Sequence, residues 1–566
     1  MTKSQVAAIL DEIGTLLAVQ GENPFRCQAY HNAARAIEQL EGNLEEVVAA
    51  GQLGSIPGIG AGLKEKITTL VTTGKLPFYE ELKAAVPAGL VEMLRLPGLG
   101  PKKVKALYDQ LGIDTLAKLK KACEAGDVAG LRGFGAKTQQ KILEGLAFLD
   151  KTGKRVLLSE ALALGTRLRE QVASHPKVIR VELCGSLRRR KETVGDLDIL
   201  ASAKEKDAPA LMDAFLTLPE VARVVAHGAT KTSVVLHNGM NCDLRVVTDA
   251  AFPFALHYFT GSKEHNIAMR ARAQAFGLKL SEYGLAGPKT DIKCKDEAEL
   301  FAALDLDYIP PELREHTGEI EAAAEHRLPH LIEHTDLRGT FHCHTDWSDG
   351  RNTLAEMVQA AQKLGLEYFG IADHSQSLTV ANGLSPARVT KQQAEIDALN
   401  KKLKGIECDI LADGRLDYDD DLLATFDYVV ASVHSHFHQS EAEMTARILR
   451  AISHPRVTML GHATGRLLLR RDGYKVDLDQ VLRAAAANGT LVEINAHPQR
   501  LDLDWLHCKH GKSLGVQFVI NPDAHTTAEI ALLPFGIDVA RRGWLTKADV
   551  FNTQPLAQVL KKLRKK

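Results

Sequence analysis

The chain has 566 residues, of which 45% are hydrophobic and 25% are charged, and its formal net charge is −1. This length exceeds what one hydrophobic core usually serves, so we expect several domains. The near-neutral total excludes a chain that is basic throughout, although basic and acidic regions that cancel one another are compatible with it.

The cysteine pattern, the N-terminal segment and the lengths of the apolar runs indicate in which compartment the protein resides. The eight cysteines are scattered and none forms a C-x-x-C pair, so we expect no disulfide framework. The N-terminal segment is amphipathic and carries acidic residues, unlike a secretory signal peptide. No apolar run is long enough to span a bilayer. We therefore predict a cytoplasmic protein without a membrane anchor.

Residues 1 to about 80 have the apolar spacing of helices with short breaks. A Gly-hydrophobic-Gly turn between helices, the signature of a helix-hairpin-helix, then occurs three times, at Gly58-Ile59-Gly60, Gly98-Leu99-Gly100 and Gly133-Phe134-Gly135. Glycine lets a backbone come close, and the N–H groups that open the second helix can bind a phosphate. Nearby lysines such as Lys102 and Lys137 would neutralise phosphate charge without reading base sequence. One such turn is weak evidence, but three predict binding to the DNA backbone.

Two predicted strands, residues 178–184 and 197–201, flank a turn that can bind phosphate. The turn contains Gly185-Ser186, whose backbone N–H groups are exposed, and it is followed by Arg188-Arg189. These features predict a phosphate site with cations on one side.

Three aspartates predict a divalent metal site beside that turn. Asp196 and Asp198 are two apart on an extended segment, so their carboxylates share one face. Asp243 lies on the second strand of a predicted hairpin closed through Asn238-Gly239. Asp-x-Asp alone often marks a solvated edge strand. Grouped carboxylates next to a phosphate turn instead favour Mg²⁺, whose other ligands are usually substrate phosphates.

These motifs resemble those of the polymerase-beta-like, or family X, DNA polymerases, and the resemblance covers roughly the first 320 residues. It implies that Asp196, Asp198 and Asp243 are catalytic metal ligands. The nucleotide-binding residues that it implies are Arg155, Gly185, Ser186, Arg189, Gly195, Tyr258, Phe259, Gly261 and Asn266. The DNA-binding residues are the six hairpin glycines, Lys102, Lys137 and Arg270. The sequence departs from the family at Arg190, where a glycine is usual, and at Lys263, where the best-known eukaryotic members carry an aspartate near the base.

The resemblance also implies a second activity for Lys66, which follows the first hairpin. The family lysine at this position forms a Schiff base with a 5′-deoxyribose phosphate, and Lys64 and Arg26 are candidates for lowering its pKa. A lysine that only contacts phosphate is an equally good interpretation.

Beyond the first 320 residues the composition changes. Histidine becomes frequent, and strands alternate with amphipathic helices such as residues 354–364 and 441–452, which predicts a barrel-like α/β domain. Candidate ligands fall at strand ends, where such barrels place their sites. They are His342, His344, Asp349, Asp373, His374, Glu407, His434, His462, Asp523 and His525. Imidazole mixed with carboxylate suits Zn²⁺, Mn²⁺ or Fe²⁺ better than Mg²⁺.

This half resembles the polymerase and histidinol phosphatase (PHP) phosphoesterases. All of these candidates except Asp373 match the family's nine-ligand pattern, which implies a site for up to three ions. Asp373, His436 and His497 would then be outer-sphere candidates.

Together, the two resemblances predict a multidomain α/β and α+β protein. Its parts are a helical lyase-like domain (1–80), a helix-hairpin-helix subdomain (81–150), a nucleotidyltransferase palm (151–250), a thumb-like subdomain (251–320), a linker (321–336) and a distorted (β/α)7 barrel of PHP type (337–566).

The expected function is gap-filling DNA synthesis by two-metal catalysis, combined with a 3′→5′ exonuclease acting on DNA 3′ ends. The partners would be gapped or primer-template DNA and deoxynucleoside triphosphates, and the protein would be a monomer. In the alternatives, the barrel is a catalytically silent scaffold or a small-molecule phosphatase.

Overall fold

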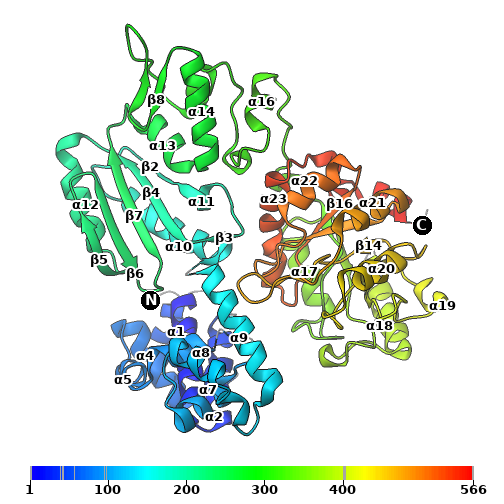
Figure 1. The fold of residues 1–566 in the computed structure, drawn as a ribbon. Coiled ribbons are helices and arrows are strands. Elements are labelled where there is room, and N and C mark those ends of the chain that lie inside the picture. Colours follow the sequence, from blue (N-terminus) through cyan, green and yellow to red (C-terminus); the bar gives the residue numbers. More distant parts are fainter. Residues whose placement is uncertain are drawn as a thin grey trace. The chain divides into compact units, whose positions relative to one another are not determined.

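The computed structural model describes residues 3–38, 40, 44–56, 58–94, 96, 98–153, 155–399 and 403–563. The chain forms two compact units, Met1–Gly153 and Lys154–Lys566 (Figure 1). Among the described residues, no helix is both long and apolar enough to cross a membrane. All eight cysteines are buried and free.

The first unit is helical throughout its described residues. Its helices are α1 (Lys3–Gln20), α2 (Pro24–Glu38), α3 (Leu44–Ala49), α4 (Ala61–Thr73), α5 (Pro77–Ala85), α6 (Ala88–Met93), α7 (Pro101–Leu111), α8 (Leu116–Ala125) and α9 (Gly135–Thr152). Leu10, Ile13 and Leu16 on α1 recur at helical spacing and are almost completely buried. One apolar cluster that runs from α1 to α9 holds the unit together.

The second unit begins with a five-stranded sheet in the order β2-β4-β7-β6-β5. Its strands are β2 (Arg180–Leu183), β4 (Asp196–Ser202), β5 (Val221–His227), β6 (Lys231–Leu236) and β7 (Asn241–Val247). The β4–β7 pair is parallel and the other neighbours are antiparallel. Two short strands, β1 (Val156–Leu157) and β3 (Thr193–Val194), pair separately.

Alternation along β4 separates a core face from a site face. Leu197, Ile199 and Ala201 pack with α10 (Leu158–Ala173) and α12 (Ala208–Leu216) in one apolar cluster. Asp196 and Asp198 therefore lie on the opposite face, as the period of two requires. The expected turn after β2 is instead a single helical turn, α11 (Gly185–Arg188), because Arg188 N–H donates to the carbonyl of Cys184.

The next region packs around a small core of its own. It contains α13 (Phe252–Thr260), α14 (Lys263–Ala275), the hairpin of β8 (Lys279–Ser281) and β9 (Gly284–Ala286), α15 (Glu297–Ala302) and α16 (Glu319–Ala324).

The C-terminal region is a seven-stranded parallel sheet with its strands in sequence order. They are β10 (Gly339–Thr340), β11 (Tyr368–Ile371), β12 (Leu403–Asp409), β13 (Tyr428–Ser432), β14 (Met459–Leu460), β15 (Leu491–Asn495) and β16 (Phe518–Asn521). A parallel bridge between Cys343 and Ala524 brings the first and last strands together, so the sheet nearly closes. The predicted distorted (β/α)7 barrel is confirmed.

Helices surround this barrel (Figure 1). They are α17 (Leu354–Lys363), α18 (Pro386–Ala398), α19 (Asp420–Leu423), α20 (Glu441–Ile452), α21 (Leu478–Asn488), α22 (Trp505–Ser513), α23 (Leu533–Arg542) and α24 (Leu556–Leu563).

The segment 321–336, expected to be a polar linker, is packed against the barrel. Its first residues belong to α16, and Ile332 is completely buried in the barrel's apolar cluster. The N–H of Ile332 donates to the carbonyl of Leu545, and Arg541 donates to the carbonyl of Ile332. Because most of the segment is charged or polar, its sequence did not indicate that Ile332 would be buried in the barrel core.

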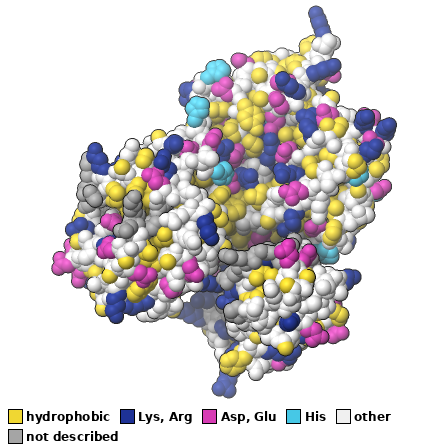
Figure 2. Space-filling view, turned by 180° about the vertical axis from the view of Figure 1, so that it is seen from behind, with side chains coloured by type: hydrophobic (Ala, Val, Ile, Leu, Met, Phe, Trp, Pro, Cys, Tyr) yellow, Lys and Arg dark blue, Asp and Glu magenta, His cyan; other side chains and the backbone are white. Residues whose placement is uncertain are grey.

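The surface agrees with the near-neutral composition. In the face that Figure 2 shows, Lys and Arg side chains are interspersed with Asp and Glu side chains on every part in view. Cation placement at particular turns therefore matters more than overall charge.

Candidate active sites

The sheet brings together the three aspartates that the sequence singled out. Asp198 on β4 and Asp243 on β7 are direct partners in the parallel register, and Asp196 lies two residues before Asp198. Cross-strand partners point to the same face, so all three carboxylates share the face away from α10 and α12. The carboxylate of Asp243 also forms an ion pair of 2.7 Å with Lys231 Nζ on β6.

Electrostatics make this cluster suited to a cation. Burial, together with the carboxylates of Asp196 and Asp243, raises the pKa of Asp198 to about 6. A divalent ion would remove the repulsion that raises this pKa. Carboxylate oxygens on one face are the hard ligands that Mg²⁺ prefers.

The phosphate turn lies directly against the carboxylates. Gly185 has φ of +61°, and a Cβ there would stand 2.4 Å from Oδ2 of Asp198. Only glycine fits this position without displacing the carboxylate. The helical turn therefore holds Ser186 beside the cluster.

The arginines of this region have separate partners. Arg155 donates from Nε to the Thr193 hydroxyl at 2.8 Å, and its Nη1 would lie 3.4 Å from a Cβ at Gly195. Arg188 forms a two-pronged ion pair with Glu297, at 2.6 and 3.1 Å. The guanidinium of Arg188 is thus committed to holding α15 against α11, which leaves Arg155 and Arg189 as the candidates for a triphosphate.

Arg189 is the more enclosed of these two candidates. Its Nε donates to Glu315 at 3.1 Å, and its Nη1 donates to the carbonyl of Thr260. Burial disfavours the charged form of Glu315, yet Arg189 and Arg542 hold the pKa of this carboxyl below its usual range. Sequence reasoning missed Glu297 and Glu315, because neither lies near the motif along the chain.

The backbone conformation at Arg190 is compatible with the glycine that is usual at this position of the family. Its φ is +57°, in the left-handed region that glycine adopts easily. The backbone therefore keeps the conformation that the usual glycine would take. The Arg190 side chain extends to Asp538 on α23, with 3.7 Å between Nε and Oδ1.

Two of the predicted nucleotide-binding residues, Tyr258 and Phe259, lie at the end of α13. Tyr258 and Phe259 meet edge to face with ring centroids 5.1 Å apart, and Asn266 donates to the carbonyl of Tyr258 at 2.7 Å. Gly261 follows, and a Cβ there would stand 3.2 Å from Nη1 of Arg189. On α14, Lys263 and Arg270 are exposed, on the helix that was expected to contact DNA.

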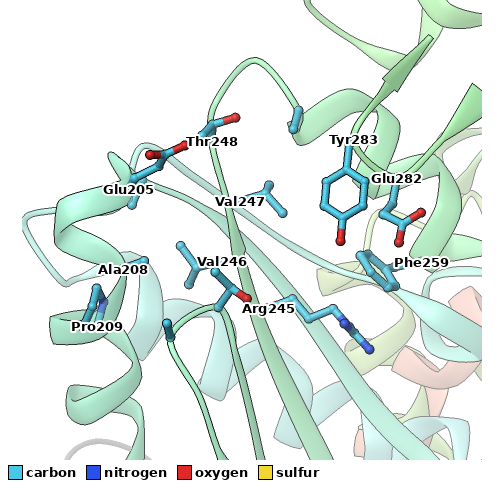
Figure 3. A pocket seen from close by; sticks show the side chains of 14 residues that line it. Glu205, Ala208, Pro209, Arg245, Val246, Val247, Thr248, Phe259, Glu282 and Tyr283 are labelled. Carbon is cyan, nitrogen blue, oxygen red and sulfur yellow. The ribbon is translucent and has the colours of Figure 1, made fainter. Parts of the chain in front are cut away.

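A pocket of about 500 Å³ separates the palm sheet from the β8–β9 hairpin. Figure 3 shows Arg245 reaching from β7 toward Phe259, with Glu282 and Tyr283 facing it. The guanidinium carbon of Arg245 lies 4.3 Å from the Phe259 ring centroid. This contact links the strand of Asp243 to the segment that carries Tyr258.

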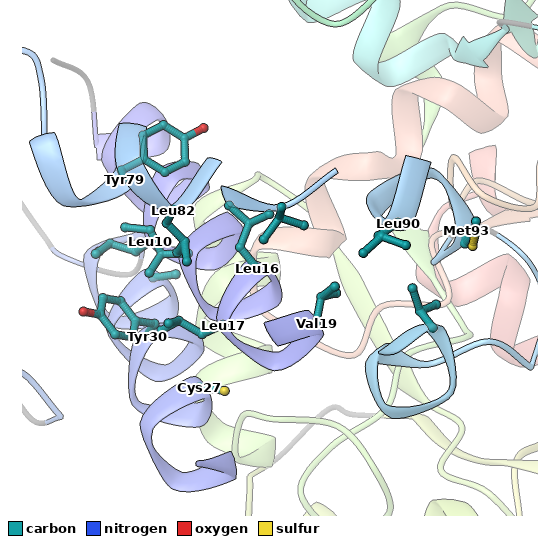
Figure 4. Packing of buried hydrophobic residues seen from close by; sticks show 14 of the residues in the cluster. Leu10, Leu16, Leu17, Val19, Cys27, Tyr30, Tyr79, Leu82, Leu90 and Met93 are labelled. Atoms are coloured by element: carbon teal, nitrogen blue, oxygen red, sulfur yellow. The ribbon is translucent and has the colours of Figure 1, made fainter. Parts of the chain in front are cut away.

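In the first unit, the hairpin turns contribute residues to the apolar core. Figure 4 shows other side chains of this core, among them Leu10, Leu16 and Leu82. The middle residues of the three turns, Ile59, Leu99 and Phe134, are buried. Gly58, Gly98 and Gly133 have φ of +87°, +81° and +90°, and a Cβ at each would meet nothing within 4 Å. Their backbones are therefore open to a large ligand.

The three hairpins differ at their second glycine. Gly60 and Gly100 are extended N-caps of α4 and α7, with φ of −79° and −88°, whereas Gly135 has φ of +72°. Lys102 and Lys137 are exposed on the helices that follow. Pro57 and Pro97 of the motifs lie outside the described residues.

Lys66 lies on α4, with its Nζ 3.4 Å from the carbonyl of Gly62 and 5.2 Å from the Phe78 ring centroid. The expected cationic neighbours have other partners. Lys64 donates to the carbonyl of Gly51, and Arg26 pairs with Glu22.

The barrel gathers its histidines and carboxylates at the carboxyl ends of the strands. Three groups have ligand atoms close enough to share an ion: His344 with Asp349, His374 and His525; His342 with His344 and Asp523; and His374 with Glu407 and His434. His462 joins through its Nε2, 2.9 Å from Oε1 of Glu407. All nine predicted ligands are thus contiguous.

Glu407 is the centre of this cluster. Its side chain is completely buried, and its carboxylate lies within 4 Å of five imidazoles. Burial opposes ionisation, but His434, His342 and His374 hold the pKa of Glu407 well below its usual range. Asp349 and His525 are partly exposed and mark the open side of the cluster.

The groups that orient the imidazoles differ from those expected. Glu493 accepts from Nδ1 of His342 at 2.7 Å, and Asp409 accepts from Nδ1 of His434 at 2.9 Å. Asp373 instead accepts from Thr345, Ser348 and Gln392, so it shapes the turn before Asp349. A carboxylate within an otherwise apolar strand would have identified Glu493 from the sequence.

His436 and His497 are the other two outer-sphere candidates. The ring of His497 accepts from the N–H of Gln499, and His436 has φ of +56° in a loop. Burial lowers the pKa of His497, and the nearby carboxylate of Asp523, one of the nine candidates, opposes this change.

Comparison with known families agrees with this division. Residues 1–76 match a helix-hairpin-helix domain, and residues 90–147 match a SAM-like helix-hairpin-helix tandem. Residues 155–240 match the DNA polymerase beta palm, residues 255–315 the DNA polymerase beta thumb, and residues 340–497 the PHP domain. The fold and the sites thus define a polymerase-beta-like nucleotidyltransferase joined to a PHP barrel.

Individual relatives narrow this class. The chain is 41% identical over 570 residues to DNA polymerase/3′-5′ exonuclease PolX of Bacillus subtilis, with 99% of each chain covered. It is 25% identical over 334 residues to DNA polymerase lambda of Rattus norvegicus, covering 54% and 55% of the two chains. It is 27% identical over 238 residues to a probable phosphatase of Thermoanaerobacter, covering 40% of this chain and 95% of that one. The chain therefore belongs to the PolX family, the family X DNA polymerases that carry a C-terminal PHP domain.

Proposed function

We propose that the protein is a DNA-directed DNA polymerase that fills gaps during DNA repair. The observation that carries this proposal is the juxtaposition of Asp196, Asp198 and Asp243 with the Gly185-Ser186 turn. Similarity to PolX of Bacillus subtilis and to DNA polymerase lambda supports it.

Each part of the palm and thumb has a role in this reaction. With Mg²⁺ bound, the three carboxylates would hold the ions that activate the primer 3′-OH and neutralise the leaving pyrophosphate. Ser186, Arg155 and Arg189 bind the triphosphate, with charge-assisted hydrogen bonds from the two arginines. A second group, made of Tyr258, Phe259, Gly261 and Asn266, contacts the sugar and the nascent base pair, and Arg270 binds the DNA.

Extension of a labelled primer on a one-nucleotide gapped duplex, with Mg²⁺ and deoxynucleoside triphosphates, tests this function. We expect addition that stops when the gap is filled. A purified, folded protein that adds no nucleotide would overturn the proposal.

For the barrel we propose a metal-dependent 3′→5′ exonuclease acting on DNA 3′ ends. The contiguous set of nine ligands supports up to three ions, and mixed imidazole and carboxylate ligands favour Mn²⁺, Zn²⁺ or Fe²⁺. A bound metal would supply a hydroxide nucleophile and neutralise the negative charge on the phosphate oxygens. Glu407 would hold these ions directly, whereas Glu493 and Asp409 orient the imidazoles of His342 and His434.

The similarity to a probable phosphatase favours a second candidate, a small-molecule phosphatase. Hydrolysis of a 3′-labelled oligonucleotide and of a simple phosphomonoester should be compared at equal metal concentration. Release of single nucleotides supports the exonuclease, and hydrolysis of the monoester alone supports the phosphatase. No hydrolysis of either would indicate a silent scaffold.

The remaining proposals concern partners and boundaries. We propose five of the six ranges given by the sequence as functional regions, all except the packed segment 321–336, with gapped DNA and nucleotides as partners of a cytoplasmic monomer. Lys66 is proposed as a 5′-deoxyribose phosphate lyase nucleophile. Borohydride should then trap a covalent adduct that Lys66→Ala does not form, and absence of trapping with the wild type would leave Lys66 as a phosphate contact.

A further inference from the structure

Three regions of the second unit meet at the carboxylate of Glu315. Arg189 reaches it from the palm, with 3.1 Å between Nε and Oε1. Arg542, the last residue of α23 on the barrel, reaches the same oxygen from Nη2, also at 3.1 Å. Glu315 is the last residue of the region that matches the thumb, so its carboxylate connects the palm, the thumb and the barrel.

Arg542 also contacts the backbone of the nucleotide turn. Its Nη1 donates to the carbonyl of Arg189 at 2.5 Å, and its guanidinium carbon lies 4.8 Å from the Trp505 ring centroid on α22. Its side chain is only 1% exposed. The Nε of Arg542 is buried without a hydrogen-bond partner in the described part of the chain, so Nη1 and Nη2 alone hold the guanidinium, and their two contacts define its orientation relative to Arg189 and Glu315.

Two further ion pairs tie the same turn to the barrel. Arg190 Nε lies 3.7 Å from Asp538 on α23, and Arg466 Nη2 lies 2.8 Å from Glu192. The barrel therefore contacts the stretch from Arg189 to Glu192 at three residues, Arg189, Arg190 and Glu192. Ser186 and Arg189, the proposed phosphate ligands, lie within or just before this stretch.

The contacts of Arg189 leave part of its guanidinium for a ligand. Its Nε and Nη1 are engaged by Glu315 and by the Thr260 carbonyl. Among the described residues, Nη2 of Arg189 has no hydrogen-bond partner within range. Arg542 donates directly to the backbone carbonyl of Arg189. It also contacts Glu315, which in turn binds the guanidinium of Arg189.

We propose that Arg542 is a positioning residue of the nucleotide site, through which the PHP barrel orients Arg189 toward the triphosphate. This inference rests on the proposed polymerase function. A ligand that meets a pre-oriented arginine loses less free energy to reorganisation, so Arg542 would strengthen triphosphate binding without touching the nucleotide.

The test compares two variants of Arg542 with a matched control. On a gapped duplex with Mg²⁺, Arg542→Met should raise the KM for the deoxynucleoside triphosphate about tenfold, the usual effect of losing one charge-assisted hydrogen bond. The kcat should change far less. Arg542→Lys, which retains the charge but cannot make both contacts, should give an intermediate KM.

Arg541→Met is the control, because Arg541 is the preceding residue and also ties the barrel to the thumb, through Glu312 at 2.7 Å. It does not contact the nucleotide turn, so its KM should match the wild type. An equal rise in KM for Arg541→Met and Arg542→Met, or no rise for either Arg542 variant, would overturn the inference.

A readout independent of catalysis uses hydrogen exchange of the unmodified protein. A non-hydrolysable deoxynucleoside triphosphate with Mg²⁺ should slow amide exchange in α23, since coupling between sites is reciprocal. Unchanged exchange in α23, while the Ser186 turn becomes protected, would overturn the inference even if Arg542→Met does not fold. Protection in a protein that fails to extend any primer would reject the polymerase function and retain the positioning role.

Discussion

The palm cluster and the barrel cluster hold their candidate metal ligands in different ways. In the palm, Asp196 is exposed, Asp243 is shared with Lys231, and burial with like charge raises the pKa of Asp198 to about 6. In the barrel, Glu407 is completely buried among imidazoles. The palm carboxylates repel one another, so a metal ion and substrate phosphates are needed to complete that site. In the barrel, neighbouring carboxylates already orient the candidate ligands by hydrogen bonds.

This difference indicates how two candidate metal sites in one chain can favour different kinds of ion. An open, all-carboxylate site suits Mg²⁺ that arrives with a nucleotide. A buried site of mixed imidazole and carboxylate ligands suits transition metals better. The predictions below test whether the sites are as separate as their chemistry indicates.

The largest expected effect is that of Asp243→Ala on synthesis. Removing one of three carboxylates should lower the rate of nucleotide addition by roughly a thousandfold, since about 4 kcal/mol of barrier corresponds to that factor. Degradation of the 3′ end should persist, because the barrel cluster is built from other strands. Primer extension and 3′-end release on the same gapped duplex measure both, and extension within a few-fold of wild type would contradict the palm assignment.

The complementary change, His344→Ala, should abolish 3′→5′ degradation and spare synthesis in Mg²⁺. His344 belongs to two of the three ligand groups, so its loss affects more than one ion position. Metal content of the purified variant should fall in parallel. Loss of synthesis in a folded His344→Ala protein would show that the two sites are not separate.

A smaller effect is expected from Glu493→Gln, which tests whether the barrel site depends on its outer groups. Glu493 orients His342, and loss of such a partner typically costs 10- to 100-fold in metal affinity or activity. Titration of the metal-free protein with Mn²⁺ gives the affinity. Glu443→Gln is a suitable control, since Glu443 is an exposed capping residue in the same domain. Equal affinities in both variants would remove the outer-sphere role.

The smallest effect should come from Gly98→Val, which acts on delivery of DNA to both sites. The positive φ and the open space at Gly98 predict weaker binding to DNA of any sequence and a similar, few-fold loss of both activities. Gly126→Val is matched to it, because Gly126 also has positive φ and open space but is the C-cap of α8 and belongs to none of the Gly-hydrophobic-Gly turns. A loss restricted to certain base sequences would contradict a backbone contact.

The chemistry of both sites could be predicted from the sequence because local spacing carries it. The period of two along β4 puts Asp196 and Asp198 on one face whatever surrounds the strand. The Gly-hydrophobic-Gly turns need only a few residues to define their backbone. The candidate barrel ligands were predictable because most of them lie at or just after the end of an apolar strand, and parallel strands of a barrel bring their carboxyl ends to one place.

Only the tertiary structure could show which groups hold these residues in position. Arg188 and Arg189 are adjacent in sequence, yet packing commits Arg188 to Glu297 and turns Arg189 toward Glu315. The Arg190 side chain pairs with Asp538, 348 residues later in the chain. Ile332 anchors a segment that looked like a polar linker. Such partners depend on how distant surfaces pack, and no local spacing encodes which carboxylate a buried guanidinium will reach.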